Sequence, residues 1–213
     1  MIACPTLSAR RILSASLILG ALALAGCDRN PLVVRRSSCP AVAVAAYVGD
    51  VTLFKGLEPD AANIDVAATI TNVRDDCTEA GDQLASRISF DVVARRTDAT
   101  EARQLVLPVF AAVVQAGNVI NAKEITQVTI NFPAGQARAV GRGNFNAAVS
   151  RKAASVPQEM MARINRDRRP GEIDAATDPM ADPEVRAALR SAMFEVLLGF
   201  QLDERALAYN VAK

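Results

Sequence analysis

The chain of 213 residues contains four cysteines and no histidine, and these two facts limit the side-chain chemistry open to it. Without histidine, the Ser-His-Asp and Cys-His nucleophile systems in their usual form are excluded, and so are histidine-based zinc sites. The sequence also contains neither a Ser-x-x-Lys motif nor a glycine loop that cradles phosphate. Carboxylate and lysine chemistry remain open, but no residue pattern names an enzymatic activity or calls for a cofactor.

Two groups of carboxylates are the remaining candidates for chemistry. Asp75 and Asp76, beside Arg74, could form an acid–base pair, whereas neighbouring acids at a strand end are more typical of turns. A second group could offer oxygen ligands to Ca²⁺, but it lacks the spacing of a calcium loop and is more typical of solvated acids. The second group consists of Glu172, Asp174, Asp178 and Asp182.

The first 26 residues have the layout of a secretory signal. Arg10 and Arg11 provide a positive head, and an apolar run of 14 residues, 12–25, follows. This run is shorter than the roughly 20 residues that cross a hydrocarbon core as a helix. Small residues gather at its end, as a cleavage site requires. The alternative is a retained membrane anchor or a buried helix.

The stretch Leu24-Ala25-Gly26-Cys27 closely resembles the lipobox of bacterial lipoproteins. The resemblance implies that a diacylglyceryl group is attached to the sulfur of Cys27 and that cleavage makes Cys27 the first residue of the mature chain. Several acyl chains on one residue form a lasting anchor, since each buried methylene contributes about 0.8 kcal/mol. Asp28 favours the inner membrane by the rule of enteric bacteria, and the sequence leaves the choice of membrane open.

The remaining cysteines suggest a disulfide. Cys4 leaves with the signal and Cys27 carries lipid, so Cys39 and Cys77 are left as an even pair in an oxidising compartment. We expect these two to be joined, with two free buried thiols as the alternative. The intervening residues 28–38 have no hydrophobic period. We therefore expect 1–26 to be a signal peptide, 27–38 a lipidated tether and 39–213 the folded domain.

The charge of the mature chain is nearly balanced. Two of the 24 basic residues and no acid lie in the signal, which leaves 22 basic and 23 acidic residues from Cys27 onward. Such a balance does not favour nucleic acid as a partner. The two tyrosines and the absence of tryptophan also make a stacking surface for bases or sugars unexpected.

Residues 151–184 concentrate charges of both signs. Six basic and two acidic residues lie in 151–169, and five acids with no base follow in 170–184. We expect the two runs to neutralise each other in a surface insertion. The sharper alternative is a contact of the basic run with lipid headgroups or a partner. The arginines of this basic cluster are Arg163, Arg166, Arg168 and Arg169.

The hydrophobic pattern from Cys39 onward has a period of two, which predicts strands. Pro108 lacks a backbone donor, so a bulge or an edge position is expected there. Ala116-Gly117-Asn118 predicts a hairpin, and Pro133-Ala134-Gly135 another turn. About six short strands are expected, at 39–54, 64–77, 87–95, 105–114, 119–132 and 136–149. Gly49-Asp50 breaks the first run, and 51–54 either pairs with it or extends it.

The C-terminal third changes character. Residues 157–169 are helical in type, and Asp182-Pro183-Glu184 is typical of a helix start. Residues 182–202 fit either one long helix or a helix to about Ser191 followed by a strand. We favour the second, because the alternation of Phe194 to Leu202 continues past Gly199. Asp203 can cap a final helix, 204–209.

These patterns predict an antiparallel immunoglobulin-like or fibronectin-like β-sandwich with a helical insertion at about 151–191, before the last strand. Beyond the signal, the chain resembles small Gram-negative envelope lipoproteins of unassigned role, a likeness that supplies no site. We expect a periplasm-facing structural or protein-interaction module with an envelope protein as partner and no catalysis. The alternatives are a carrier of a small ligand or lipid and, more distantly, a hydrolytic enzyme.

Overall fold

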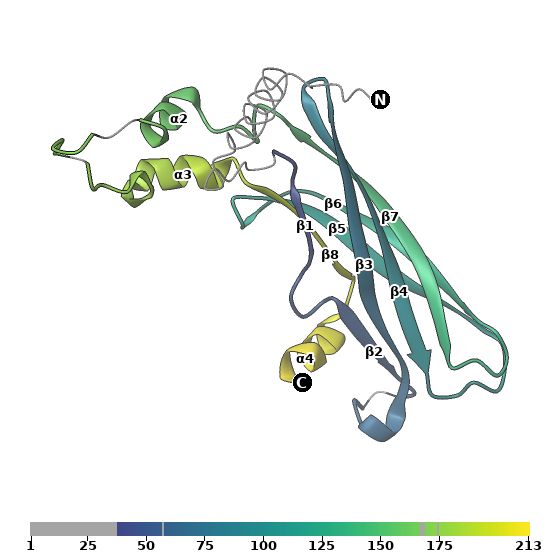
Figure 1. The fold of residues 1–213 in the computed structure, drawn as a ribbon. Coiled ribbons are helices and arrows are strands. Elements are labelled where there is room, and N and C mark those ends of the chain that lie inside the picture. Colours follow the sequence, from purple (N-terminus) through teal and green to yellow (C-terminus); the bar gives the residue numbers. More distant parts are fainter. Residues whose placement is uncertain (1–37, 57, 167–168, 174) are drawn as a thin grey trace, which may run out of the picture. The chain divides into compact units, whose positions relative to one another are not determined.

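The structure is a computed structural model, and it describes residues 38–56, 58–166, 169–173 and 175–213. Its strands form two four-stranded sheets (Figure 1). Neighbouring strands are antiparallel except β1 and β8, which are parallel. In spatial order, sheet A consists of β1 (Ala41–Val44), β8 (Phe194–Phe200), β5 (Arg103–Gln115) and β6 (Val119–Phe132), and sheet B of β2 (Asp50–Phe54), β3 (Ile64–Ala80), β4 (Gln83–Arg96) and β7 (Arg138–Ser150).

Helical segments are inserted where the sequence changes character. Between β7 and β8 lie α2 (Gln158–Ile164), the 3-10 turn η2 (Pro179–Ala181) and α3 (Pro183–Ser191). A further 3-10 turn, η1 (Ala61–Asn63), joins β2 to β3, and α4 (Glu204–Ala212) follows β8. The chain is therefore mainly β, with a helical insertion before the last strand, as the sequence predicted. Residues Ser38–Lys213 form one compact unit.

The two sheets share one hydrophobic core. Successive side chains of a strand point to opposite faces, so alternate residues of each strand can face the other sheet. In β4 this places Ile88 and Val92 inside, and in β6 it places Val128 and Ile130 inside, all four fully buried. The alternation of apolar residues in these two strands therefore corresponds to their buried faces.

Glycines in β7 let large side chains fill this core. Gly143 pairs with Phe90 of β4, and a Cβ atom built on Gly143 would lie 2.3 Å from the Phe90 ring. That ring stacks on Phe145, with the ring centroids 5.8 Å apart. A Cβ on Gly141 would likewise lie 2.8 Å from the backbone oxygen of Thr129 in β6. These glycines weaken the strand preference of β7, but they allow close packing in the core between the sheets.

The number and length of the predicted strands were wrong. The first predicted run, 39–54, forms two strands in different sheets, so residues 51–54 neither extend the first strand nor pair with it. The chain turns between them at Tyr47, whose φ is 64°. Five strands have 13 residues or more, with 17 in β3. Alternation identifies where a strand lies, but its length depends on how far a neighbouring strand continues the ladder.

Asp75 and Asp76 do not form the turn that is typical of neighbouring acids. They lie inside β3, which continues to Ala80, and the register shifts earlier, between Thr71 and Arg74. Asp76 lies opposite Arg87 of β4, a favourable cross-strand pair. The ladder with β4 therefore overrides the local turn preference of the two acids.

Pro108 lies in a central strand, between β8 and β6, and without a bulge at its position. The backbone N–H of Gln201 donates to the carbonyl of Pro108, so the missing donor of Pro108 also faces the β8 side. The ladder between β5 and β8 begins only at Val109. The expectation of a bulge or an edge position was therefore wrong. The proline is tolerated because its missing donor lies where the ladder between β5 and β8 ends.

The choice of a helix followed by a strand near the C-terminus is confirmed. Asp182 accepts a hydrogen bond from the backbone N–H of Glu184 at the start of α3, which ends at Ser191. The strand β8 then begins at Phe194. Asp203 accepts a hydrogen bond from Ala206 and caps α4, which runs three residues beyond the predicted end to Ala212.

One buried arginine connects two loops. Arg96, at the end of β4, is 3% exposed, and its guanidinium donates to the carbonyls of Ala99, Pro133 and Gln136 at 2.9–3.2 Å. The guanidinium also lies 5.0 Å from the centroid of the Phe132 ring. These contacts join the β4–β5 connection to the β6–β7 connection, so these two crossings between the sheets are held together at one end.

We expect Gly143→Ala to destabilise the fold by about 1–3 kcal/mol, because the new methyl would overlap the packed Phe90 ring. Denaturant unfolding measures this loss. Gly56→Ala is the matched control, since no atom lies within 4 Å of a Cβ built there. Equal stability of the two variants would contradict the packing described for β7.

Candidate interaction surfaces

The disulfide expected from the cysteine count is present between Cys39 and Cys77. Cys39 precedes β1 of sheet A, and Cys77 lies in β3 of sheet B, so the bond joins the two sheets. Its partners are 38 residues apart in sequence, a loop whose closure stabilises a fold by about 4 kcal/mol in the chain-entropy account. Cys27, the predicted lipidation site, lies outside the described residues.

The basic cluster of the insertion is matched by the acids that follow it. Arg163 of α2 forms ion pairs with Asp182 and, at 2.8 Å, with Glu184 at the start of α3. The hydrogen bond with Glu184 and the charge of Asp182 raise the pKa of Arg163. Arg166 lies 3.6 Å from Glu172. The prediction that the two charged runs neutralise each other is confirmed for these two arginines.

Of the other two arginines of the cluster, only Arg169 lies within the described residues. The backbone N–H of Arg169 donates to the carboxylate of Glu172 at 3.3 Å, and Arg168 lies outside the described residues. At least Arg163 and Arg166 of the insertion are therefore already paired with carboxylates. These ion pairs compete with any contact between the two arginines and lipid headgroups.

The acids proposed for Ca²⁺ have local roles instead. Asp178 caps η2 by accepting from Met180, and Asp182 caps α3 and pairs with Arg163. Asp174 lies outside the described residues. Within the described ranges, no group of three or more histidine, cysteine, aspartate or glutamate side chains could hold a metal ion.

Asp75 and Asp76 point to opposite faces of sheet B, because they are consecutive residues of one strand. They therefore do not face a common substrate as an acid–base pair would. Burial raises the pKa of Asp75, a hydrogen bond from the Ser86 hydroxyl at 3.4 Å lowers it in part, and the charge of Asp76 raises it further. The raised pKa results from a strand position that is partly covered, beside the disulfide.

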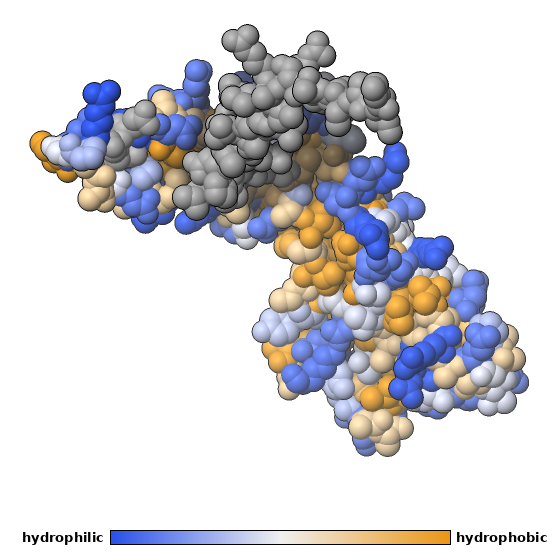
Figure 2. All heavy atoms as spheres, in the orientation of Figure 1, coloured by the Kyte–Doolittle hydropathy of each residue, from blue (hydrophilic) through white to orange (hydrophobic). Residues whose placement is uncertain are grey.

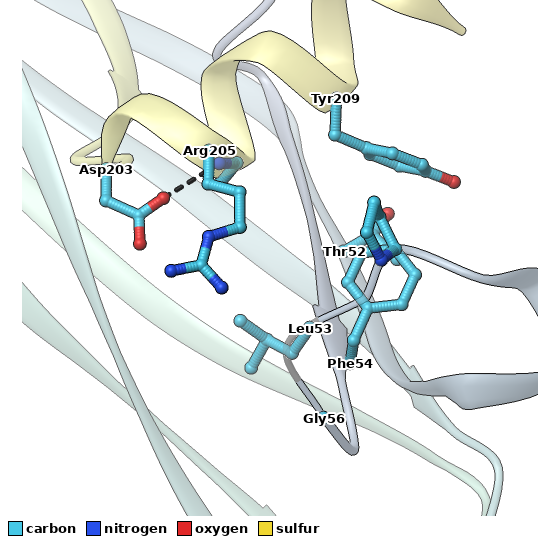
Figure 3. Close-up of a pocket in the computed structure, with 9 residues that line it drawn as sticks. Thr52, Leu53, Phe54, Gly56, Asp203, Arg205 and Tyr209 are labelled. Carbon is cyan, nitrogen blue, oxygen red and sulfur yellow. Dashed lines mark hydrogen bonds between the residues drawn. The ribbon is translucent and has the colours of Figure 1, made fainter.

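A surface hollow of about 200 Å³ lies between β2 and α4 (Figure 3). Leu53 and Phe54 form its apolar side, and the Tyr209 ring lies edge-on to Phe54 at 5.1 Å between centroids. Asp203 and Arg205 form its charged rim. The hollow is smaller than the roughly 300–1,000 Å³ of typical ligand sites, and it lies outside the space between the two sheets.

Sequence reasoning missed the role of Asn210 in α4. This side chain is 4% exposed and donates to the backbone carbonyls of Tyr47 and Asp50 at 2.8 and 2.7 Å. Lys213 pairs with the carboxylate of Asp50. These contacts fix α4 against the turn between β1 and β2. In the sequence, the only signal for this role of Asn210 was an amide side chain among the apolar residues of a short helix.

Among the described residues, β6 forms one of the two edges of sheet A, and its first half is uncovered. All residues from Val119 to Ile125 are exposed, whereas alternate residues of the second half are buried. The exposed apolar residues are Val119 at 50%, Ile120 at 64% and Ile125 at 51%. The sequence predicted the strand but not its place at an edge, because sheet order depends on contacts between distant residues.

A charged residue that would usually protect such an edge is turned away from it. Lys123 of β6 donates to the Gln201 side chain at 2.8 Å, and its ammonium lies 4.6 Å over the Phe110 ring of β5. Both partners lie on the side of β6 that faces the sheet. Lysines at edges oppose strand addition when they project outward, so this lysine leaves the edge accessible.

Two further results concern the chain as a whole. No helix within the described residues is long and apolar enough to cross a membrane. No protein-family model, curated protein or solved structure matches the chain. Its activity must accordingly be inferred from its own residues and contacts.

The raised pKa of Asp75 predicts a pH dependence of stability. The folded chain binds this proton more tightly than the unfolded chain, whose value is near 3.8. The stabilisation is therefore complete below that pH and is lost as the pH rises through the folded-state pKa. We expect Asp75→Asn to raise Tm at about pH 7 and to leave it unchanged at about pH 3.

Thermal unfolding at the two pH values measures the effect of Asp75→Asn. The control is Glu58→Gln, which neutralises an exposed carboxylate in the loop after β2. An Asp75→Asn effect that is the same at both pH values would show that the charge of Asp75 is not its cause.

Proposed function

We propose that the protein is a lipid-anchored module of the bacterial cell envelope that binds a partner protein through the free edge of β6, without catalysis of its own. The observation that carries the proposal is the uncovered half of β6, with three exposed β-branched side chains next to unpaired strand edge. An extended segment of a partner can add to such an edge through main-chain hydrogen bonds, while apolar side chains give selectivity.

The proposed location depends on the first residues of the chain. A basic head, an apolar run and Leu24-Ala25-Gly26-Cys27 favour export, cleavage and lipidation of Cys27. The disulfide between Cys39 and Cys77 supports an oxidising compartment such as the periplasm. The choice between inner and outer membrane stays open, with Asp28 favouring the inner one.

The finer fold assignment remains part of the proposal. Two antiparallel-rich sheets around one core support a β-sandwich. An immunoglobulin-like or fibronectin-like topology has less support, because β2, β3 and β4 are consecutive neighbours in sheet B. In the constant-type immunoglobulin arrangement, the chain instead leaves a sheet after at most two consecutive strands.

A carrier of a small ligand or lipid is the second candidate. The hollow between β2 and α4 favours it, since Leu53, Phe54 and Tyr209 offer apolar contacts beside a charged rim. The close approach of Gly141 in β7 to Thr129 in β6 leaves little space between the sheets at that level. A hydrolytic enzyme is a distant third, because histidine is absent and Asp75 and Asp76 face opposite ways.

We expect Cys27→Ser to release the protein from membranes, because the acyl chains would have no attachment site. Fractionation of cells expressing either chain measures the change, and the intact mass of the native protein reports the acyl groups. Native material that still carries Met1 and no acyl mass at Cys27 would overturn the proposed anchoring.

The edge of β6 is tested by photo-crosslinking in intact cells, with a photoreactive residue at the exposed position 122. We expect one partner protein to be captured, and Ile120→Lys with Ile125→Lys to lower its yield at least tenfold, as loss of central apolar contacts does. The control is Val211→Lys, an exposed valine of α4. Unchanged capture by the β6 variant would assign binding to another surface.

A further inference from the structure

The outer face of sheet B is rich in arginine. The residues that point away from the core in β3, β4 and β7 include five arginines and three aspartates, although the mature chain as a whole is nearly neutral. The strongly hydrophilic residues of this region alternate with apolar ones (Figure 2). The arginines are Arg74, Arg87, Arg95, Arg138 and Arg142, and the aspartates are Asp65, Asp76 and Asp91.

Two of these arginines lie directly opposite each other. Arg95 of β4 pairs with Arg138 of β7. The next pair, Arg96 with Ala137, carries a backbone hydrogen bond, so Arg95 and Arg138 form the adjacent non-hydrogen-bonded pair. In such a pair the side chains are closest, and like charges there destabilise a sheet.

Nearby acids do not relieve this repulsion. Asp65 is the aspartate nearest in register, and its two carboxylate oxygens each accept a hydrogen bond at 2.9 Å from Arg103. Asp91 lies 3.6 Å from Arg142 and also accepts from Asn72. Among the described residues, no ion pair neutralises Arg95 or Arg138.

An apolar pair lies beside the two arginines. Val93 and Val140, the next outward-facing pair along the same two strands, are 40% and 56% exposed. Arg87 is eight residues from Arg95 along β4, so the basic residues extend over about 27 Å. This distance is longer than any small anion, so the ligand that fits these basic residues is an extended, negatively charged surface.

We infer that the outer face of sheet B binds the anionic phospholipid surface to which the chain is anchored. Guanidinium groups bind phosphate in a bidentate manner, and basic residues near an anionic leaflet each contribute about 1 kcal/mol. The inference rests on the proposed anchoring for its setting, since residues 28–37 extend at most about 36 Å from the lipid. The headgroup contact then involves sheet B rather than the arginines paired in the insertion.

The experiment compares full-length chains carrying Cys27→Ser, so that the acyl anchor does not contribute. Binding is measured to vesicles of phosphatidylglycerol mixed with phosphatidylcholine and, separately, to vesicles of phosphatidylcholine alone. Binding to phosphatidylcholine alone reports the contribution of the apolar signal segment, which is present in all the chains compared. We expect phosphatidylglycerol to strengthen binding, and Arg95→Gln with Arg138→Gln to reduce this gain about 30-fold.

The matched control is Arg186→Gln with Arg190→Gln, which removes the same charge from two exposed positions of α3. We expect this variant to keep the gain from phosphatidylglycerol. The Tm of the sheet B variant should equal or exceed that of the parent chain, because like-charge repulsion is removed. That result would separate loss of binding from loss of fold.

Three results would overturn the inference. The first is the absence of any gain from phosphatidylglycerol, and the second is an equal loss in both double variants, which would reflect net charge alone. The third is binding of a poly-glutamate peptide without binding of the vesicles, which would assign the face to an acidic protein. None of these results bears on acylation of Cys27, which the mass of the native protein reports separately.

Discussion

The fold depends on one contact, the packing of the inner face of sheet B against the inner face of sheet A. Phe90 and Phe145 fill the space on one side, and the glycines of β7 allow β6 to approach on the other. A core of this kind tolerates little added volume, because packed side chains have no free space to move into. With the inner faces committed to each other, recognition is left to the outer faces and edges.

The connections between the sheets are fixed by polar groups rather than by further apolar burial. Arg96 holds the loops at one end through three backbone carbonyls, and Asn210 holds the β1–β2 turn through two. The disulfide between Cys39 and Cys77 joins the sheets covalently. Arg96 and Asn210 satisfy backbone carbonyls that the strands cannot pair, so these crossovers are anchored without enlarging the core.

The two sheets present different chemistry outward. Sheet A ends in β6, whose exposed β-branched residues lie beside an accessible edge, and sheet B carries unpaired arginines beside an exposed valine pair. In the two proposals made above, sheet B faces the bilayer and the edge of sheet A binds a protein. The helical insertion contributes ion pairs among its own charges and joins β7 to β8.

The sequence by itself determined the features that depend on neighbouring residues: the alternation of β4 and β6, the caps at Asp182 and Asp203, and the even pair of cysteines. It could not determine that Tyr47 divides the first run between two sheets, that β6 is an edge, or that Arg95 faces Arg138. These depend on which strands become neighbours, a choice made by contacts between residues far apart in the chain. Local patterns give each residue a face, and only the tertiary structure decides what that face meets.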